Sequence, residues 1–196
     1  NKLYTSATSS STRSVIFGGM TPDRLNKIDF VTISTQGFAA DFGDITGTNQ
    51  ASGACSNSTR ALMVGGSGTT PSTATSAIQY ITISTLGNAI DFGDLTVARM
   101  GINGCSSPTR GLFVGANRPE GNIIDFVEIS TTGNATDFGD MTVTRKQGYA
   151  QMASATRGVF GGGRNSSNAA VNVIDYITIA STGNAQDFGD LTSAKG

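Results

Sequence analysis

The sequence predicts an all-β protein built from four copies of one structural unit. A seventeen-residue block recurs without a gap at 28–44, 78–94, 124–140 and 174–190, and its third copy reads IDFVEISTTGNATDFGD. A Thr-Arg pair followed by an apolar run that ends near glycine also occurs four times. The chain has 26 glycines and no sustained helical periodicity, which favours turns and strands. A repeat at a nearly fixed period indicates a repetitive architecture.

The recurrent block is expected to form a β-hairpin. Its first arm is rich in β-branched and aromatic residues, and both alternating sets are apolar, so the strand should be covered on both faces. Gly-Asn in the middle of three copies, and Gly37-Phe38 in the first, suit a tight turn. The second arm contains Asp-Phe-Gly-Asp, written DFGD below. We expect its aromatic residue to fill the space between neighbouring sheets: Phe42, Phe92, Phe138 and Phe188.

Two more strands complete the unit. The apolar run after each Thr-Arg pair reads as a buried strand with a glycine stop, and the small polar stretch before the pair reads as a strand in a crowded position. Four strands in a unit of ~40–50 residues predict the blades of a β-propeller. The chain is then a single repeat domain, 1–196, with units at approximately 1–48, 49–98, 99–144 and 145–196.

The sequence leaves ring closure open. The chain starts and ends at the same phase of the repeat, so it contains four whole units. Four blades can close into a ring, since propellers have ~4–8 blades. The alternative is a segment of a larger propeller, completed by other copies or further repeats. An open arc would expose apolar blade faces, and self-association through those faces is one expected kind of partnership.

The order of these features resembles the kelch repeat of β-propellers. The resemblance rests on Arg99, the run Leu112-Phe113-Val114-Gly115, the arm Ile124-Asp125-Phe126, and the DFGD copy at 137–140, and it covers essentially the whole chain. The chain departs from the kelch pattern because it has no Trp, and the DFGD phenylalanines stand where that Trp would be. The near-identical copies are also similar to repeats in bacteriophage tail-fibre and microbial surface proteins.

Composition excludes several classes of partner. The net charge is −1 and charged residues make up 14% of the chain, so no basic surface for nucleic acid is expected. No apolar run approaches the ~18–20 residues of a membrane-spanning helix, so we expect no membrane insertion. We interpret Cys55 and Cys105, at equivalent repeat positions, as buried thiols. A disulfide between adjacent units is the alternative, and the redox state stays open.

The repeated charges are interpreted as structural. The arginines of the Thr-Arg pairs are Arg13, Arg60, Arg110 and Arg157. Gln79 replaces the aspartate of the hairpin arm in the unit that retains Arg60, so we favour an aspartate of DFGD as the arginine's partner. The last aspartates of the four DFGD copies, also interpreted as structural, are Asp44, Asp94, Asp140 and Asp190. Two carboxylates are too few for Ca²⁺, so we expect turn capping, no metal and no cofactor.

Catalysis has little support in the sequence. DFGD occurs four times, without the other kinase motifs, so it is not a kinase signature here. The chain has no His, which excludes a Ser-His-Asp or Cys-His arrangement, and its carboxylates belong to every repeat rather than to one site. We therefore expect a protein that is not an enzyme, with no catalytic residues.

The connection between the glycine run and the hairpin is the expected ligand-binding region. Its length varies as 8, 11, 7 and 11 residues, whereas the other segments keep theirs, which marks a surface loop. The candidate residues are Asp23, Arg24, Thr69, Thr70, Asn117, Arg118, Arg164 and Asn165.

Three functions remain open at this point. The resemblance favours a structural or adhesion propeller of a virion fibre or microbial surface appendage, extracellular or on the virion surface, that binds a protein or a cell-surface glycan. The first alternative is an intracellular kelch-like scaffold for protein partners. The second is a lectin or glycosidase-like module that binds a sugar.

Overall fold

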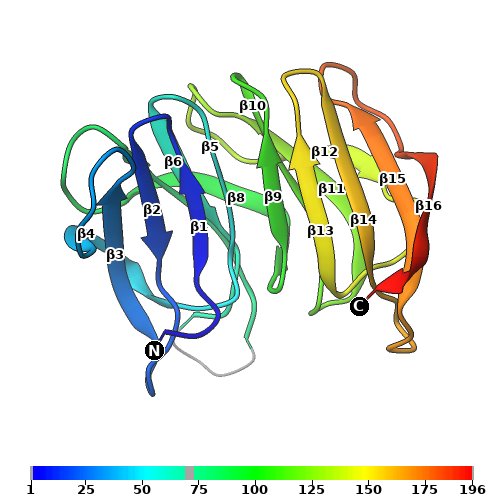
Figure 1. The fold of residues 1–196 in the computed structure, drawn as a ribbon, viewed down its shortest axis with the longest axis horizontal. Coiled ribbons are helices and arrows are strands. Elements are labelled where there is room, and N and C mark those ends of the chain that lie inside the picture. The colour runs from blue at the N-terminus through cyan, green and yellow to red at the C-terminus, as the bar shows by residue number, and fades with distance from the viewer. Residues whose placement is uncertain (1, 69–72, 196) are drawn as a thin grey trace.

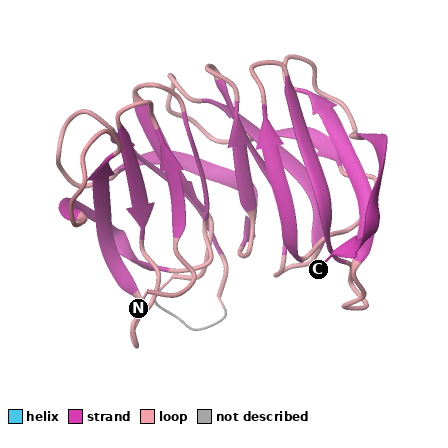
Figure 2. Ribbon diagram, viewed as in Figure 1, coloured by secondary structure: helices cyan, strands magenta, loops and turns pink. Residues whose placement is uncertain are grey.

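The protein is a row of four small β-sheets. The structure, a computed structural model, describes residues 2–68 and 73–195. These residues form sixteen strands in four antiparallel sheets, and each sheet holds four strands in chain order (Figure 1). Figure 2 shows strands and loops only, and no described segment forms a helix long and apolar enough to cross a membrane. The predicted all-β fold, with four four-stranded units in a propeller-like arrangement, is confirmed.

We call each sheet a blade. Blade one contains β1 (Ser6–Ser9), β2 (Arg13–Phe17), β3 (Leu25–Thr32) and β4 (Ala40–Asn49). Blade two contains β5 (Gly53–Ser56), β6 (Arg60–Val64), β7 (Thr75–Thr82) and β8 (Ile90–Arg99). Blade three contains β9 (Asn103–Ser106), β10 (Arg110–Ala116), β11 (Gly121–Glu128) and β12 (Thr136–Asp140). Blade four contains β13 (Gln147–Ala153), β14 (Arg157–Arg164), β15 (Val171–Thr178) and β16 (Gln186–Lys195).

The small-residue stretches form the first strand of each blade, as predicted. These strands approach one another closely, so there is little room for side chains. A Cβ added at Gly104 of β9 would lie 2.6 Å from the carbonyl oxygen of Ala54 in β5. Hydroxyl groups fill the remaining space, and the Oγ atoms of Ser6 and Ser52 lie 2.8 Å apart. Small residues therefore allow the first strands of neighbouring blades to pack side by side.

Three apolar cores hold the blades together, one at each junction. The outgoing face of a blade packs against the incoming face of the next blade along the chain. At the first junction Val15, Phe17 and Phe42 pack against Met63 and other residues of blade two. The second and third junctions are built the same way, around Phe92 and around Phe138. Within each blade the DFGD phenylalanine also makes an edge-to-face contact with the aromatic residue of the hairpin arm, as in Phe126 and Phe138, whose centroids are 5.8 Å apart.

The hairpin turn of each blade caps the DFGD strand of the blade before it. The Gly133 N–H donates to the Phe92 carbonyl at 2.7 Å, and the Asp94 N–H donates to the Asn134 side chain at 3.0 Å. The same bonds recur at the other two junctions. The approach is so close that a Cβ at Gly139 would lie 2.5 Å from the Gly183 carbonyl oxygen. Because the neighbouring blade approaches so closely, this position of DFGD requires a glycine.

The prediction that a DFGD aspartate pairs with the Thr-Arg arginine is wrong. The antiparallel register sets Arg13 opposite Thr32 but sets Asp44 opposite Lys27, five residues away along β3. Each arginine instead stacks on the aromatic ring of its own hairpin arm, at 4.6–4.9 Å from the centroid. In blades one to three its guanidinium also donates to a carbonyl of the next blade: Arg13 to Ile83, Arg60 to Ile129 and Arg110 to Ile179.

The aspartate of the hairpin arm has a different arginine partner, from the preceding blade. Arg99 at the end of β8 contacts Asp125 at 2.6 Å, and Arg145 after β12 contacts Asp175 at 2.9 Å. All four side chains are buried. At the first junction the corresponding residues are Asn49 and Gln79, and Gln79 accepts a hydrogen bond from the Thr46 N–H at 2.7 Å. At this junction the arginine and the aspartate are therefore both replaced by uncharged residues.

The four blades do not close into a ring. Blades one and four lie at opposite ends of an open arc (Figure 1). The consequence is visible at the DFGD phenylalanines: Phe42, Phe92 and Phe138 are 2–3% exposed, but Phe188 is 56% exposed. The expectation that all four fill a space between sheets thus fails at Phe188, because no blade of this chain follows it.

Cys55 and Cys105 are buried and not bonded to each other, as the favoured interpretation predicted. Each thiol packs against a glycine of the next blade, Gly111 and Gly158 respectively. Burial raises the pKa of Cys105 from 9.0 to about 12 and raises that of Cys55 further. These thiols are neutral core side chains.

Candidate ligand-binding cleft on the loop face

A polar cleft forms where loops and inter-blade connections of blades one to three meet. Its volume is about 310 Å³, which suits a small ligand or one residue of a larger one. We call it the loop-face cleft. The lining residues are Tyr4, Arg24, Gln50, Ala51, Ser67, Met100, Gly101, Asn117 and Arg118.

Three of the residues proposed from the sequence line this cleft. Arg24 comes from the β2–β3 loop of blade one, and Asn117 and Arg118 come from the corresponding loop of blade three. Two loops that are distant in sequence therefore supply cationic and amide groups to one site. Asp23 is exposed and is not among the lining residues. Thr69 and Thr70 lie outside the described residues.

Arg164 and Asn165 belong to blade four and stabilise their own loop. The Arg164 guanidinium donates to the carbonyl of Asn168 at 2.9 Å, and the Asn165 side chain accepts from the Ala169 N–H at 3.0 Å. Neither residue lines the loop-face cleft. Among the described residues, the variable loops therefore do not form one continuous site.

Sequence reasoning missed the part of the cleft formed by the connections between blades. Gln50 with Ala51, and Met100 with Gly101, directly follow the last strand of blades one and two. Tyr4, Ala51 and Gly101 share one repeat position and all have positive φ, between 55° and 68°. A non-glycine residue with such a φ is uncommon and marks a fixed turn. The signal available in the sequence was the constant distance of these positions from DFGD.

Three buried polar atoms in the cleft lack a partner among the described residues. They are Nε of Arg24, Oε1 of Gln50 and Oγ of Ser67. The backbones of Gln50 and Ser67 are joined by two hydrogen bonds, of 2.8 and 3.2 Å, which fix the positions of both residues. Buried polar groups are normally hydrogen-bonded, so these three atoms leave hydrogen-bonding capacity unused in the wall of the cleft.

The charge of the lining is positive. Among the described residues, Arg24 and Arg118 are the charged members of the lining, which includes no Asp or Glu. Tyr4 and Met100 add an apolar surface beside these polar groups. The cleft can therefore accept a carboxylate or phosphate on the arginines, with hydroxyl or apolar parts of the same ligand on the remaining residues.

The DFGD aspartates serve local structure. In the third and fourth copies the first aspartate accepts a hydrogen bond from the glycine two residues later, as Asp137 does from the Gly139 N–H at 3.1 Å. Of the second aspartates, Asp44 pairs with Lys27 at 2.8 Å and Asp94 accepts from the Ser76 hydroxyl at 2.8 Å. The backbone N–H of Asp140 donates to Asn184 of the next blade, while Asp190 is exposed.

Across the described ranges no three His, Cys, Asp or Glu side chains gather in a metal-binding group.

A second polar groove lies between the first strands of the blades and has a volume of about 290 Å³. Two of its hydroxyl groups, those of Ser6 and Ser52, are paired with each other at 2.8 Å. The Gln151 amide of blade four donates to the Gly104 carbonyl at 2.6 Å across the same groove. These contacts join blades, so we regard the groove as part of the structural core of the arc.

Comparison with known proteins found no family model and no curated protein sequence that matches this chain. Any assignment of function therefore depends on the fold and on the chemistry of the clefts described above.

Proposed function

We propose that this protein is a non-enzymatic, kelch-like binding propeller of a virion fibre or microbial surface appendage, and that its loop-face cleft binds a cell-surface glycan that carries an acidic group. The convergence of Arg24 and Arg118 in one cleft supports this proposal most directly. The resemblance of the near-identical repeats to tail-fibre and surface proteins supports the extracellular location.

The chemistry of the lining favours an acidic sugar over a neutral one. Each arginine can form charge-assisted hydrogen bonds with a carboxylate, and these are about twice as strong as neutral ones. Asn117 adds an amide group that can bond to hydroxyl groups, and Tyr4 is 63% exposed, so its ring is available to pack on a sugar face.

The test is binding to an array of neutral and acidic glycans, followed by titration of the best ligand. We expect acidic glycans to bind, with an affinity that falls as salt concentration rises, because exposed charge pairs are screened. Replacing Arg24 or Arg118 with Ala should weaken binding at least about tenfold, which corresponds to ~1.4 kcal/mol.

Arg164→Ala is the matched control, because Arg164 ends β14, where the equivalent loop of blade four begins, and lies outside the cleft. It should leave the affinity unchanged. Binding confined to neutral glycans, or an equal loss in all three variants, would contradict the proposed site. No binding to any glycan would contradict the proposed function.

A further inference from the structure

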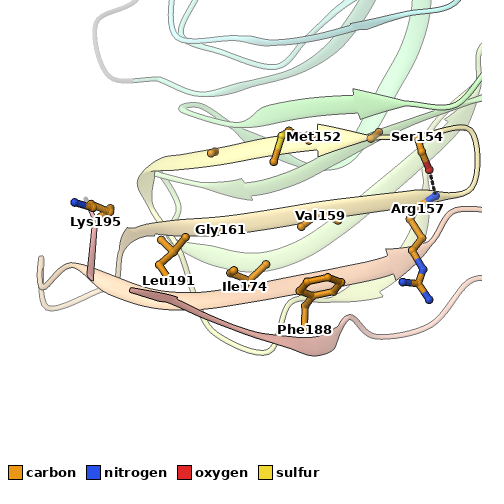
Figure 3. A pocket seen from close by; sticks show the side chains of 11 residues that line it. Met152, Ser154, Arg157, Val159, Gly161, Ile174, Phe188, Leu191 and Lys195 are labelled. Carbon is orange, nitrogen blue, oxygen red and sulfur yellow. Dashed lines mark hydrogen bonds between the residues drawn. The ribbon is translucent and has the colours of Figure 1, made fainter. Parts of the chain in front are cut away.

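The outgoing face of blade four is an inter-blade surface without a blade on it. A cavity of about 690 Å³ lies over this face, and Figure 3 shows Met152, Val159, Ile174, Phe188 and Leu191 along it. Val159, Ile174, Phe188 and Leu191 occupy the repeat positions of Leu112, Ile124, Phe138 and Met141, which form the core between blades three and four. Met152 occupies the position of Cys105 and is 68% exposed.

The incoming face of blade one is uncovered in the same way. Ile33 follows β3 and is 54% exposed, whereas Ile83, Ile129 and Ile179 at the same repeat position are at most 2% exposed. Val31 and Ile16 belong to the same face and are partly buried. Their equivalents in blade two, Ile81 and Met63, are buried in the first junction. The two ends of the arc therefore carry the two complementary halves of one inter-blade junction.

Most polar groups of a junction are also present at the two ends. At each internal junction an arginine of the outgoing face donates to the carbonyl of the isoleucine equivalent to Ile33. Arg157 already lies over the Tyr176 ring at 4.8 Å, in the same arrangement as the other three arginines. The Phe188 carbonyl is in the position that accepts a hydrogen bond from the next blade's turn, and Gly37 has the corresponding N–H.

The number of blades then limits the assembly. Four blades leave the arc open, and propellers typically have ~4–8 blades. A ring made of whole copies of this chain within that range has about eight blades and two copies. We propose that two copies of this chain associate head to tail, so that the outgoing face of blade four in each copy covers the incoming face of blade one in the other. The assembly is a closed ring with two identical new junctions.

Two features at the ends of the arc differ from the internal junctions. Phe38 occupies the position of Asn88, Asn134 and Asn184, so a new junction lacks one hydrogen bond to the backbone of Asp190. Lys2 and Lys195 share the repeat position of Arg99, and Lys2 already pairs with Asp29, the equivalent of Asp125. Lys195 of one copy and Lys2 of the other therefore compete for Asp29. Either lysine can move away at a low cost in free energy, because both lie near a chain end.

The test is sedimentation velocity over a range of protein concentrations. The unmodified chain should form a dimer as concentration rises. A chain that remains monomeric at high concentration would overturn the proposal, as would open-ended growth into larger species, because closure limits the ring to two copies.

Two charge substitutions test the head-to-tail geometry. Phe188→Asp places a charge on the outgoing face, and Ile33→Asp places one on the incoming face. Both side chains are exposed in the single chain, so each variant should keep the parent's circular dichroism spectrum and melting temperature at a concentration where the parent is monomeric. Each variant alone should be monomeric, since both new junctions contain a charged residue.

Mixing the two variants gives the decisive result. The Phe188→Asp chain retains an intact incoming face and the Ile33→Asp chain retains an intact outgoing face, so one unmodified junction can form between them. We expect a heterodimer in the equimolar mixture, at higher concentration than the parent needs. If the Ile33→Asp chain alone still dimerises, the association uses two identical faces and the head-to-tail arrangement is wrong.

Phe38→Asn should strengthen the dimer by about fivefold per junction, because it restores a hydrogen bond that the internal junctions possess. Phe38→Ala is the matched control, since it removes the same exposed ring without supplying the amide. Equal strengthening by both variants would show that the Asn bond is not formed, and the proposed register of the new junction would then be wrong.

Discussion

Arg99 and Asp125 form a fully buried ion pair, 2.6 Å between Nη2 and Oδ2, that joins the last strand of blade two to the third strand of blade three. The Thr96 hydroxyl donates to the same carboxylate at 2.7 Å, and the Arg99 guanidinium also donates to the Ile123 carbonyl at 2.9 Å. These bonds compensate the desolvation of both charges. The equivalent position at the first junction shows that an uncharged Asn and Gln can replace the pair.

We expect Asp125→Ala to destabilise the protein by about 3–5 kcal/mol, because it leaves the Arg99 charge buried without its carboxylate. The double variant Arg99→Asn with Asp125→Gln copies the residues of the first junction and should recover most of that loss. Urea denaturation of the single and double variants measures both effects. Additive losses in the double variant would show that the two side chains do not act as a pair.

The DFGD phenylalanines offer a comparison of one side chain in two environments. Phe92→Ala and Phe138→Ala should each cost about 3–5 kcal/mol, since both rings are buried between blades. Phe188→Ala should cost less than about 1 kcal/mol in the monomer, because its ring is exposed. Denaturation at a concentration where the chain is monomeric tests this difference. Equal losses at all three positions would contradict the open arc.

The DFGD glycines provide a second matched pair. A Cβ at Gly139 would lie 2.5 Å from the Gly183 carbonyl oxygen, whereas a Cβ at Gly189 would meet nothing within 4 Å. Both glycines have positive φ, so Ala strains the backbone at either position. We expect Gly139→Ala to be worse than Gly189→Ala by about 1–3 kcal/mol, the usual cost of overpacking. Thermal unfolding of the two variants is the measurement.

The buried thiols should reduce stability at alkaline pH. Their pKa is raised in the folded protein, to about 12 for Cys105, from 9.0 in the unfolded chain. Below pH 9 both forms are protonated and the full stability is present. Above that pH the unfolded chain loses protons that the folded protein keeps, so stability falls with a slope of up to about 1.4 kcal/mol per pH unit for each thiol. Cys105→Ala should reduce the slope between pH 9 and 11 relative to the parent, and an unchanged slope would contradict this assignment.

The sequence also contained the clue to the buried ion pairs, but the arginine could not be identified from it. Gln79 occurs in the only unit whose preceding blade has Asn49 in place of an arginine, whereas Asp125 and Asp175 follow Arg99 and Arg145. Arg60 is closer to Gln79 along the chain, but it lies opposite Thr82, at the other end of the hairpin arm. The correct pairing joins different blades, so it depends on how the sheets stack and on their register.

The repeat by itself determined the strands and their division into four sheets. The period, the alternation of apolar residues and the small-residue stretches are local properties, and strand formation follows from them. The burial of Phe42, Phe92 and Phe138 followed from the same pattern. The repeat pattern, however, does not decide between a closed ring and an open arc, so the exposure of Phe188 depended on an outcome that the sequence left open.

Only the tertiary structure decided the open arc and the loop-face cleft. Closure depends on the angle between neighbouring blades, which is set by side-chain packing across three junctions and is not a property of any one unit. The cleft likewise joins Arg24 to Arg118 and to the connections at Gln50 and Met100, because stacking brings the same edge of three blades together. The residues were visible in the sequence, but their proximity results from the way the blades pack.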